Sequence, residues 1–111
     1  MIKSLIHCWN LSPKEAERLQ IQLKDRVVTS DDFKKVNTVA GVDIGYSKKS
    51  DTAVAGIAVL SFPEMESIEK KVVKGRVTFS DILGLLAFRE GPLIDKLFNK
   101  LNRKPDIIMF D

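Results

Sequence analysis

Residues 52–60 carry apolar or small side chains on both faces of a strand, and this limits the possible folds more than any other feature. One face carries Ala53, Ala55, Ile57 and Val59, and the other carries Val54, Ala58 and Leu60. A strand that is apolar on both faces belongs inside a sheet rather than at its edge. The chain must therefore supply a strand on each side of this one.

The segments that flank residues 52–60 have strand character themselves. Residues 38–46 form a mostly apolar run, and residues 67–78 form a more polar run that contains four basic side chains. Polar turn residues at 47–51 and a loop at 61–66 separate the three runs. Short connections between consecutive strands predict an antiparallel meander.

A helix is predicted ahead of the strands. Ser12, Pro13 and Glu15 form a capping box, with proline at the first helical position. The apolar face of this helix consists of Ala16, Leu19, Leu23 and Val27. We expect Trp9 to pack beneath the same helix.

A second helix and a fourth strand are predicted after the meander. Pro92 supplies the helix start, just after Glu90, and Pro105 prevents its continuation. The apolar stripe of the helix consists of Leu93, Ile94, Leu97, Phe98 and Leu101. Residues 107–110 form a short apolar run, and a right-handed crossover would return it parallel to the sheet. This α/β order of helix, three antiparallel strands, helix and parallel strand matches the first half of a ribonuclease H-like fold.

Length and composition limit the class of protein. The 111 residues suit one domain, 1–111, and 18 Lys+Arg against 15 Asp+Glu give a formal charge of +3. No apolar run approaches the roughly 20 residues of a membrane span, so no membrane association is expected. Cys8 is the single cysteine, which excludes an intrachain disulfide and suits a reducing, cytoplasmic compartment. The basic charge permits nucleic-acid binding without requiring it.

Three carboxylates stand out by position, namely Asp43, Glu90 and Asp111. Asp43 lies in an otherwise apolar strand, and Asp111 directly follows another. If those strands are parallel neighbours, the two carboxylates lie side by side, and their repulsion favours a divalent cation between them. Because the chain has only one histidine, the metal would be a hard ion such as Mg²⁺, with Mn²⁺ as a substitute.

An ordinary structural explanation of the same residues stays open. Asp43 could lie in water at a strand end, Glu90 could pair with Arg89 or a lysine, and Asp111 could be a solvated terminus. The pattern of carboxylates does not decide between a metal site and these solvated positions.

Three segments together resemble the motifs of the endonuclease V family. The first is residues 39–46, which contain Asp43 and Tyr46; the second is residues 84–92, preceded by 77–79; the third is residues 104–111. They follow in order with natural spacing, and the resemblance covers nearly the whole chain. The string from Gly84 to Pro92 is its most specific part.

The resemblance implies a Mg²⁺-dependent DNA repair endonuclease. Such an enzyme recognises deaminated bases, above all in deoxyinosine, and cuts the second phosphodiester on the 3′ side; some members prefer inosine in RNA. Asp43, Glu90 and Asp111 would be the catalytic metal ligands, and Tyr46 would lie near the cut strand. The wall of the base pocket would include Gly84, Leu85 and Leu86, although core packing alone could explain Leu85.

Basic side chains beside this site are candidate phosphate contacts. Lys48 and Lys49 lie in the turn after Tyr46, where phosphate contact and simple solvation are comparable explanations. The lysines and the arginine at residues 96–104 are more simply explained as solvated.

The sequence departs from the family pattern in two places. Ser80-Asp81-Ile82-Leu83 stands where the family usually has a segment with an aromatic wedge, and the loss of base stacking should weaken lesion binding. The glycine-rich stretch and later strands expected after Asp111 are also missing. We therefore expect an incomplete sheet and weak or absent activity of the 111-residue chain alone.

Two alternatives to the nuclease remain. Asp43, Gly45 and Ser47 superficially fit the phosphate loop of an actin-like or sugar-kinase ATP-binding module. The chain could also be a non-catalytic nucleic-acid-binding fragment that needs a second chain to complete its sheet. The sequence leaves the oligomeric state undetermined.

Overall fold

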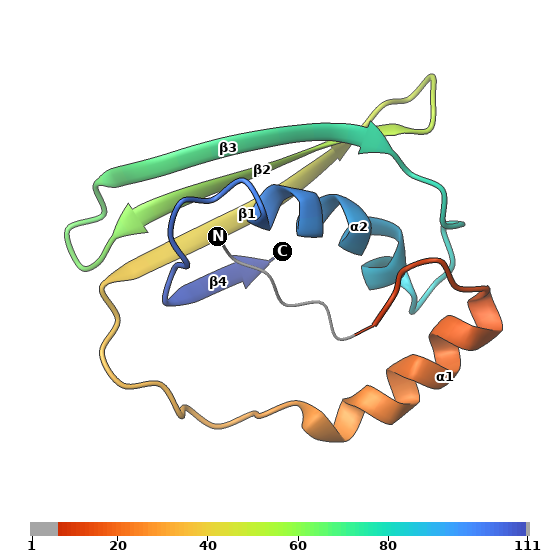
Figure 1. The fold of residues 1–111 in the computed structure, drawn as a ribbon, viewed down its shortest axis with the longest axis horizontal. Coiled ribbons are helices and arrows are strands. Elements are labelled where there is room, and N and C mark those ends of the chain that lie inside the picture. The colour runs from red at the N-terminus through yellow and green to blue at the C-terminus, as the bar shows by residue number, and fades with distance from the viewer. Residues whose placement is uncertain (1–6, 111) are drawn as a thin grey trace.

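A four-stranded mixed sheet forms the centre of the molecule (Figure 1). The computed structural model describes residues 7–110. Its strands are β1 (Thr38–Tyr46), β2 (Thr52–Ser61), β3 (Ser67–Arg76) and β4 (Ile107–Phe110), in the spatial order β3-β2-β1-β4. β2 pairs antiparallel with β1 and β3, and β4 pairs parallel with β1. The predicted meander and its parallel fourth strand are confirmed.

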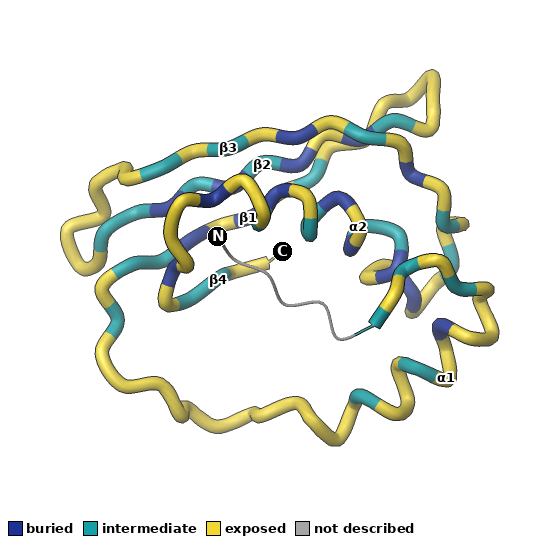
Figure 2. Tube along the Cα trace, in the orientation of Figure 1, coloured by how far each residue is buried: buried dark blue, intermediate teal, exposed yellow. Residues whose placement is uncertain are grey.

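Helix α2 (Leu86–Phe98) packs on one face of this sheet and closes the main core. The core contains alternate residues of β1 and β2, among them Val42 and Ile57, together with Leu93 and Leu97 of the helix. Leu97 is completely buried. In Figure 2 the buried positions gather where α2 lies against the strands.

The opposite face of the sheet is left open, which corrects the expectation that β2 is buried on both faces. Val54 is 43% exposed, and Gly56 and Ala58 are only half-buried. β2 does lie inside the sheet, as predicted, because both of its edges are paired. Its second face is uncovered because α2 covers only one side and no other helix of residues 7–110 packs there.

Helix α2 begins at Leu86, so the predicted start at Pro92 is wrong. Pro92 lies inside the helix, and Glu90 is a helical residue rather than one that precedes the helix. The helix begins earlier because Leu85 and Phe88 are buried, and the Phe88 N–H donates to the Leu85 carbonyl at 3.1 Å. Proline fits the helical φ and removes one backbone hydrogen bond, a cost that the buried stripe offsets.

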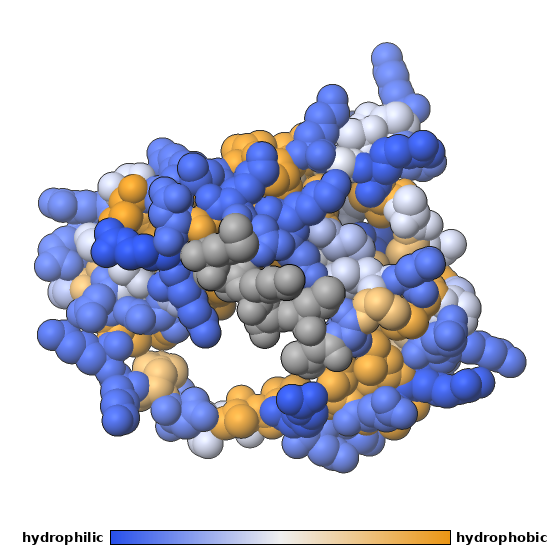
Figure 3. Space-filling view, viewed as in Figure 1, coloured by the Kyte–Doolittle hydropathy of each residue, from blue (hydrophilic) through white to orange (hydrophobic). Residues whose placement is uncertain are grey.

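Helix α1 (Pro13–Leu23) begins with the predicted capping box. The Glu15 N–H donates to Ser12 Oγ at 3.2 Å, and the Ser12 N–H donates to Glu15 Oε1 at 2.9 Å. Of its predicted apolar face only Ala16 is buried, while Leu19 and Leu23 are half-buried. Val27 lies beyond the helix, which ends at Leu23 and is followed by a short 3-10 turn, η1 (Lys24–Arg26). Val27 is 67% exposed, and apolar side chains lie along the lower margin of Figure 3, where α1 and the next segment run.

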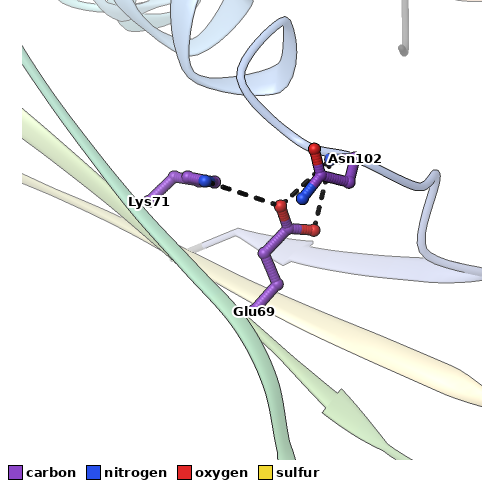
Figure 4. A network of polar contacts seen from close by, with 3 residues as sticks. All are labelled: Glu69, Lys71 and Asn102. Atoms are coloured by element: carbon purple, nitrogen blue, oxygen red, sulfur yellow. Dashed lines mark hydrogen bonds and ion pairs between the residues drawn. The ribbon is translucent and has the colours of Figure 1, made fainter.

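Two polar contacts attach β4 and its preceding loop to the sheet. The Asp106 carboxylate accepts hydrogen bonds from the Asn37 and Thr38 N–H groups at 2.8 and 3.1 Å, and the Asp106 N–H donates to Thr38 Oγ1. At the other end of the loop, both Glu69 carboxylate oxygens accept from the Asn102 N–H, while Lys71 lies 3.9 Å from Glu69 (Figure 4). These contacts hold the start of β4 beside the start of β1.

We predict that Asp106→Ala destabilises the fold in a pH-dependent way. The backbone N–H groups of Asn37 and Thr38 hold the pKa of Asp106 below its usual range, so the carboxylate stabilises the fold above the ordinary carboxyl pKa of about 3.9. This contribution is lost as the pH falls through the lowered pKa. Thermal unfolding followed by circular dichroism should show a lower Tm for the variant at pH 7 and a smaller difference below about pH 4.

Asp81→Ala, which removes an exposed carboxylate in the connection from β3 to α2, is the matched control for Asp106→Ala. It should leave the Tm near that of the unchanged chain. An equal Tm loss in both variants would mean that the Asp106 contacts contribute nothing specific.

Candidate functional site

Asp43 lies in β1, where it pairs with Gly56 of β2. Within residues 7–110 the ladder between β1 and β4 runs to the Val42–Phe110 pair, and Asp43 is the next residue of β1. Its Oδ1 accepts a hydrogen bond from the Ile44 N–H at 2.9 Å. Strand alternation places the buried Val42 and the exposed Asp43 on opposite faces of the sheet.

Glu90 reaches the end of β1 from helix α2. Its Oε2 accepts a hydrogen bond from the Tyr46 hydroxyl at 2.6 Å. The guanidinium of the neighbouring Arg89 lies 5.2 Å from the centre of the Tyr46 ring, and its Nη1 donates to the Phe79 carbonyl at 2.7 Å. Two consecutive helical residues thus contact the last side chain of β1.

One small cavity is lined by both Asp43 and Glu90. Its volume is about 190 Å³, and it is lined by Val42, Asp43, Ile44, Leu86, Glu90, Ile94 and Phe110. Hydrogen bonds among the described residues engage one oxygen of Asp43 and one of Glu90, so the donor set suits a hard cation. Phe110 directly precedes Asp111, the third predicted ligand, which lies outside the described residues. Within residues 7–110, no three acidic, histidine or cysteine side chains form a cluster that could hold a metal.

The residues predicted to form the base pocket are divided between cavity and core. Leu86 is 50% exposed and lines the cavity of Asp43 and Glu90. Leu85 is buried with Ala16 and Phe88 in a second core cluster, as ordinary packing would have it. Gly84 has a φ of 88°, a conformation that favours glycine, and its carbonyl accepts from Gln20 Nε2. A role for these residues in base binding stays a prediction.

Lys48 and Lys49 are exposed in the turn between β1 and β2. The Lys49 N–H donates to Ser47 Oγ at 3.3 Å, and the Ser47 N–H donates to the Thr52 carbonyl at 2.9 Å. The turn follows Tyr46 directly, so both lysines lie at the end of β1 that carries the carboxylates. Their contact with phosphates is likewise a prediction.

Trp9 fixes the N-terminal segment against helix α2, a contact that the sequence did not reveal. Its ring lies so close to Gly91 that a Cβ there would collide with it, and its Nε1–H donates to Asp95 Oδ2 at 2.5 Å. The predicted packing beneath α1 also occurs, because Trp9 contacts the cluster that contains Ala16 and Phe88. A glycine one residue after Glu90 was the available signal, but no spacing rule connects it to a tryptophan 82 residues earlier.

Comparisons with solved structures define the fold class. The chain superimposes on endonuclease V from Bacillus subtilis with a TM-score of 0.84 and 34% identity, over 95% of this chain and 46% of that one. A second match is endonuclease V from Ciona intestinalis, in complex with DNA containing an inosine followed by a ribo-adenosine. It gives a TM-score of 0.77 and 32% identity, over 91% of this chain and 47% of that one. The fold is ribonuclease H-like, as predicted.

Sequence comparisons then identify the family. The sequence model of the family described as Endonuclease V matches residues 21–111. Endonuclease V of Rippkaea orientalis is 43% identical over 110 residues, which cover 99% of this chain and 48% of the relative. Endonuclease V of Roseiflexus castenholzii is 36% identical over 111 residues, which cover 100% of this chain and 49% of that relative. The chain belongs to the endonuclease V family and spans about half the length of these curated relatives.

The helices of the described region are all too short or too polar to cross a membrane.

We predict that Tyr46, the single tyrosine, ionises at an unusually high pH. Burial and the hydrogen bond to Glu90 raise the pKa of Tyr46 to about 12, from an ordinary value near 10. The associated stabilisation is complete below about pH 10 and is lost as the pH rises through about 12. Tyrosinate absorbance should therefore appear later in the folded chain than in urea, and Glu90→Gln should shift the folded titration downward. Equal titration curves for the folded and urea-unfolded chain would contradict the Tyr46–Glu90 contact.

We predict that Gly91→Ala destabilises the chain by about 1–3 kcal/mol, because the added methyl group overlaps the Trp9 ring. Urea unfolding followed by the fluorescence of Trp9, the single tryptophan, measures this loss. Gly41→Ala is a matched control, since a Cβ at Gly41 meets no atom within 4 Å. A similar effect of both substitutions would exclude the Trp9 contact as the cause.

Proposed function

We propose that this chain forms the part of a metal-dependent endonuclease that holds Asp43 and Glu90, and that the enzyme acts on DNA containing deaminated bases. The observation that carries the proposal is that Asp43 of β1 and Glu90 of α2 line one cavity, together with Phe110 of β4. Membership of the endonuclease V family supports the same conclusion. Membership of this family also argues against the ATP-binding module that the sequence left open as an alternative.

Asp43 and Glu90, with Asp111, are the residues that would hold Mg²⁺ or Mn²⁺. Carboxylate oxygens are the preferred ligands of both ions. A divalent ion bound there supplies an activated water and stabilises the leaving oxygen of a phosphodiester. Because the proposed nucleophile is water, no side chain of the protein forms a covalent intermediate.

The other residues of the site have binding roles in this proposal. Lys48 and Lys49 are exposed on the side of the carboxylates, where they would contact backbone phosphates. Leu86 is the one predicted base-pocket residue that lines the cavity, so it is the best candidate for contact with a flipped base. The open turn at Gly84 lies next to it.

The proposed substrate is a deoxyinosine-containing strand, cut at the second phosphodiester on the 3′ side of the lesion. The Ciona relative was crystallised with inosine-containing DNA, which supports this substrate class. Inosine-containing RNA is the alternative substrate. Residues 80–83 lack an aromatic side chain, and base stacking is worth about 1–3 kcal/mol, so weak lesion binding is expected.

The 111 residues correspond to about half of each curated relative, so we propose that full activity requires further polypeptide. The 111-residue chain is expected to cut weakly or not at all, and the complete enzyme to work in the cytoplasm. A non-catalytic nucleic-acid-binding role is the second candidate. The uncovered face of β2 favours it, because an open sheet face is a surface for association.

We predict that a single-inosine duplex is nicked slowly in Mg²⁺ or Mn²⁺ and that Asp43→Ala abolishes the nick. Loss of groups that only support metal ligands costs about 10–100-fold, so removal of a ligand should cost at least about 100-fold. Gel analysis of an end-labelled strand measures the rate and the position of the cut. Glu64→Ala, which removes an exposed carboxylate in the loop between β2 and β3, is the control and should cut like the unchanged chain.

Each result of this assay has a distinct meaning. A nick that survives Asp43→Ala would contradict the proposed site. Salt-sensitive DNA binding without any nick would favour the non-catalytic role for this chain. A nick at the expected position, lost only with Asp43→Ala, would show that the 111 residues contain a working site.

A further inference from the structure

We infer that the hydroxyl group of Tyr46 positions the Glu90 carboxylate for metal binding. The inference rests on the proposed function, because it assumes that Glu90 is a ligand. It assigns Tyr46 a different role from the contact with the cut strand that the family resemblance implies. The observation behind it is that Tyr46 and Glu90 are directly hydrogen-bonded although 44 residues separate them.

The hydrogen bond selects one oxygen of Glu90. The distance of 2.6 Å from the Tyr46 hydroxyl to Oε2 is typical of a strong bond from O–H to a carboxylate. With Oε2 engaged, rotation of the carboxylate group is restricted and Oε1 is the oxygen presented to a cation. Ligands whose orientation is set by a hydrogen bond bind metal more tightly than freely rotating ones.

The Tyr46 ring is itself held from the helix side. The Arg89 guanidinium lies over the ring at 5.2 Å, and its hydrogen bond to the Phe79 carbonyl at 2.7 Å restrains the guanidinium. Tyr46 is 41% exposed, so packing alone would leave the ring free to change rotamer. The attraction between cation and ring keeps the hydroxyl directed at Glu90.

This arrangement also connects the two elements that carry the proposed ligands. Asp43 and Tyr46 lie three residues apart on β1, and Arg89 and Glu90 are neighbours on α2. Both helical residues contact the same tyrosine, so they join the end of β1 to the helix beside the cavity that Asp43 and Glu90 line. A ligand pair drawn from two separate elements needs such a connection to keep a productive geometry.

The test is the Mn²⁺ affinity of four chains: unchanged, Tyr46→Phe, Glu90→Gln and the double variant. Electron paramagnetic resonance of free Mn²⁺ measures the Kd without any catalytic assay. Tyr46→Phe keeps the ring under Arg89 and removes only the hydroxyl, so affinity should fall about 10-fold. The same substitution should have no further effect in the Glu90→Gln background, because a residue that acts through Glu90 has nothing left to position.

Ser50→Ala is the control variant. It removes a hydroxyl that donates to Thr52 Oγ1 at 3.0 Å, four residues beyond Tyr46, and should leave the Kd unchanged. Thermal unfolding of every variant separates a loss of folding from a loss of affinity. If Tyr46→Phe lowers the Tm yet binds Mn²⁺ like the unchanged chain, the contact is structural and the inference is wrong.

The remaining outcomes separate this inference from the function on which it rests. If Tyr46→Phe lowers the Mn²⁺ affinity equally with and without the Glu90 carboxylate, Tyr46 acts independently of Glu90. That result would overturn the inference and leave the metal site in place. An unchanged Kd in Glu90→Gln, or no Mn²⁺ binding by the unchanged chain, would overturn the proposed metal site and the inference together.

Discussion

The burial of one stripe of helix α2 against one face of the sheet is the interaction on which the rest of the structure depends. Leu93 and Leu97 share one buried cluster with residues of the strands, among them Ile57 of β2 and Val73 of β3, and this packing positions the helix on the sheet. Because Glu90 lies one turn before Leu93 and two turns before Leu97 on the same helix, it is carried to the part of β1 that contains Asp43 and Tyr46. The candidate site is therefore a product of core packing.

Two contacts on either side of Glu90 refine this placement. Arg89 is held over Tyr46 and bonds the Phe79 carbonyl, while Gly91 admits the Trp9 ring against the helix backbone. The residues at 89, 90 and 91 thus contact three different parts of the chain. The second core cluster, with Ala16, Leu85 and Phe88, supports the same turn of the helix from the side of α1.

The other face of the sheet differs in character from the packed one. A shallow groove there is lined by small residues at its centre, Gly41, Gly56 and Ala58, with Val72 and Met109 at its margins. Val72 is 63% and Met109 66% exposed. The relatives, which are about twice as long as this chain, have correspondingly more polypeptide with which to cover such a surface. The second face of β2 is as apolar as the first, which explains why the sequence pattern indicates burial on both sides.

The sequence by itself determined the strands, their order along the chain and the capping box of α1, because these depend on local alternation and on side chains a few residues apart. It also singled out Asp43 and Glu90 as candidate ligands, a prediction that rests on a carboxylate in an apolar setting and on a specific motif. It misplaced the start of α2 at Pro92, because the burial of Leu85 and Phe88 outweighs a local proline signal. Only the tertiary structure decided that Tyr46 bonds Glu90, that Trp9 lies on Gly91 and that one sheet face stays open. These features depend on contacts between residues far apart in the chain, and local sequence patterns do not specify which distant side chains come into contact.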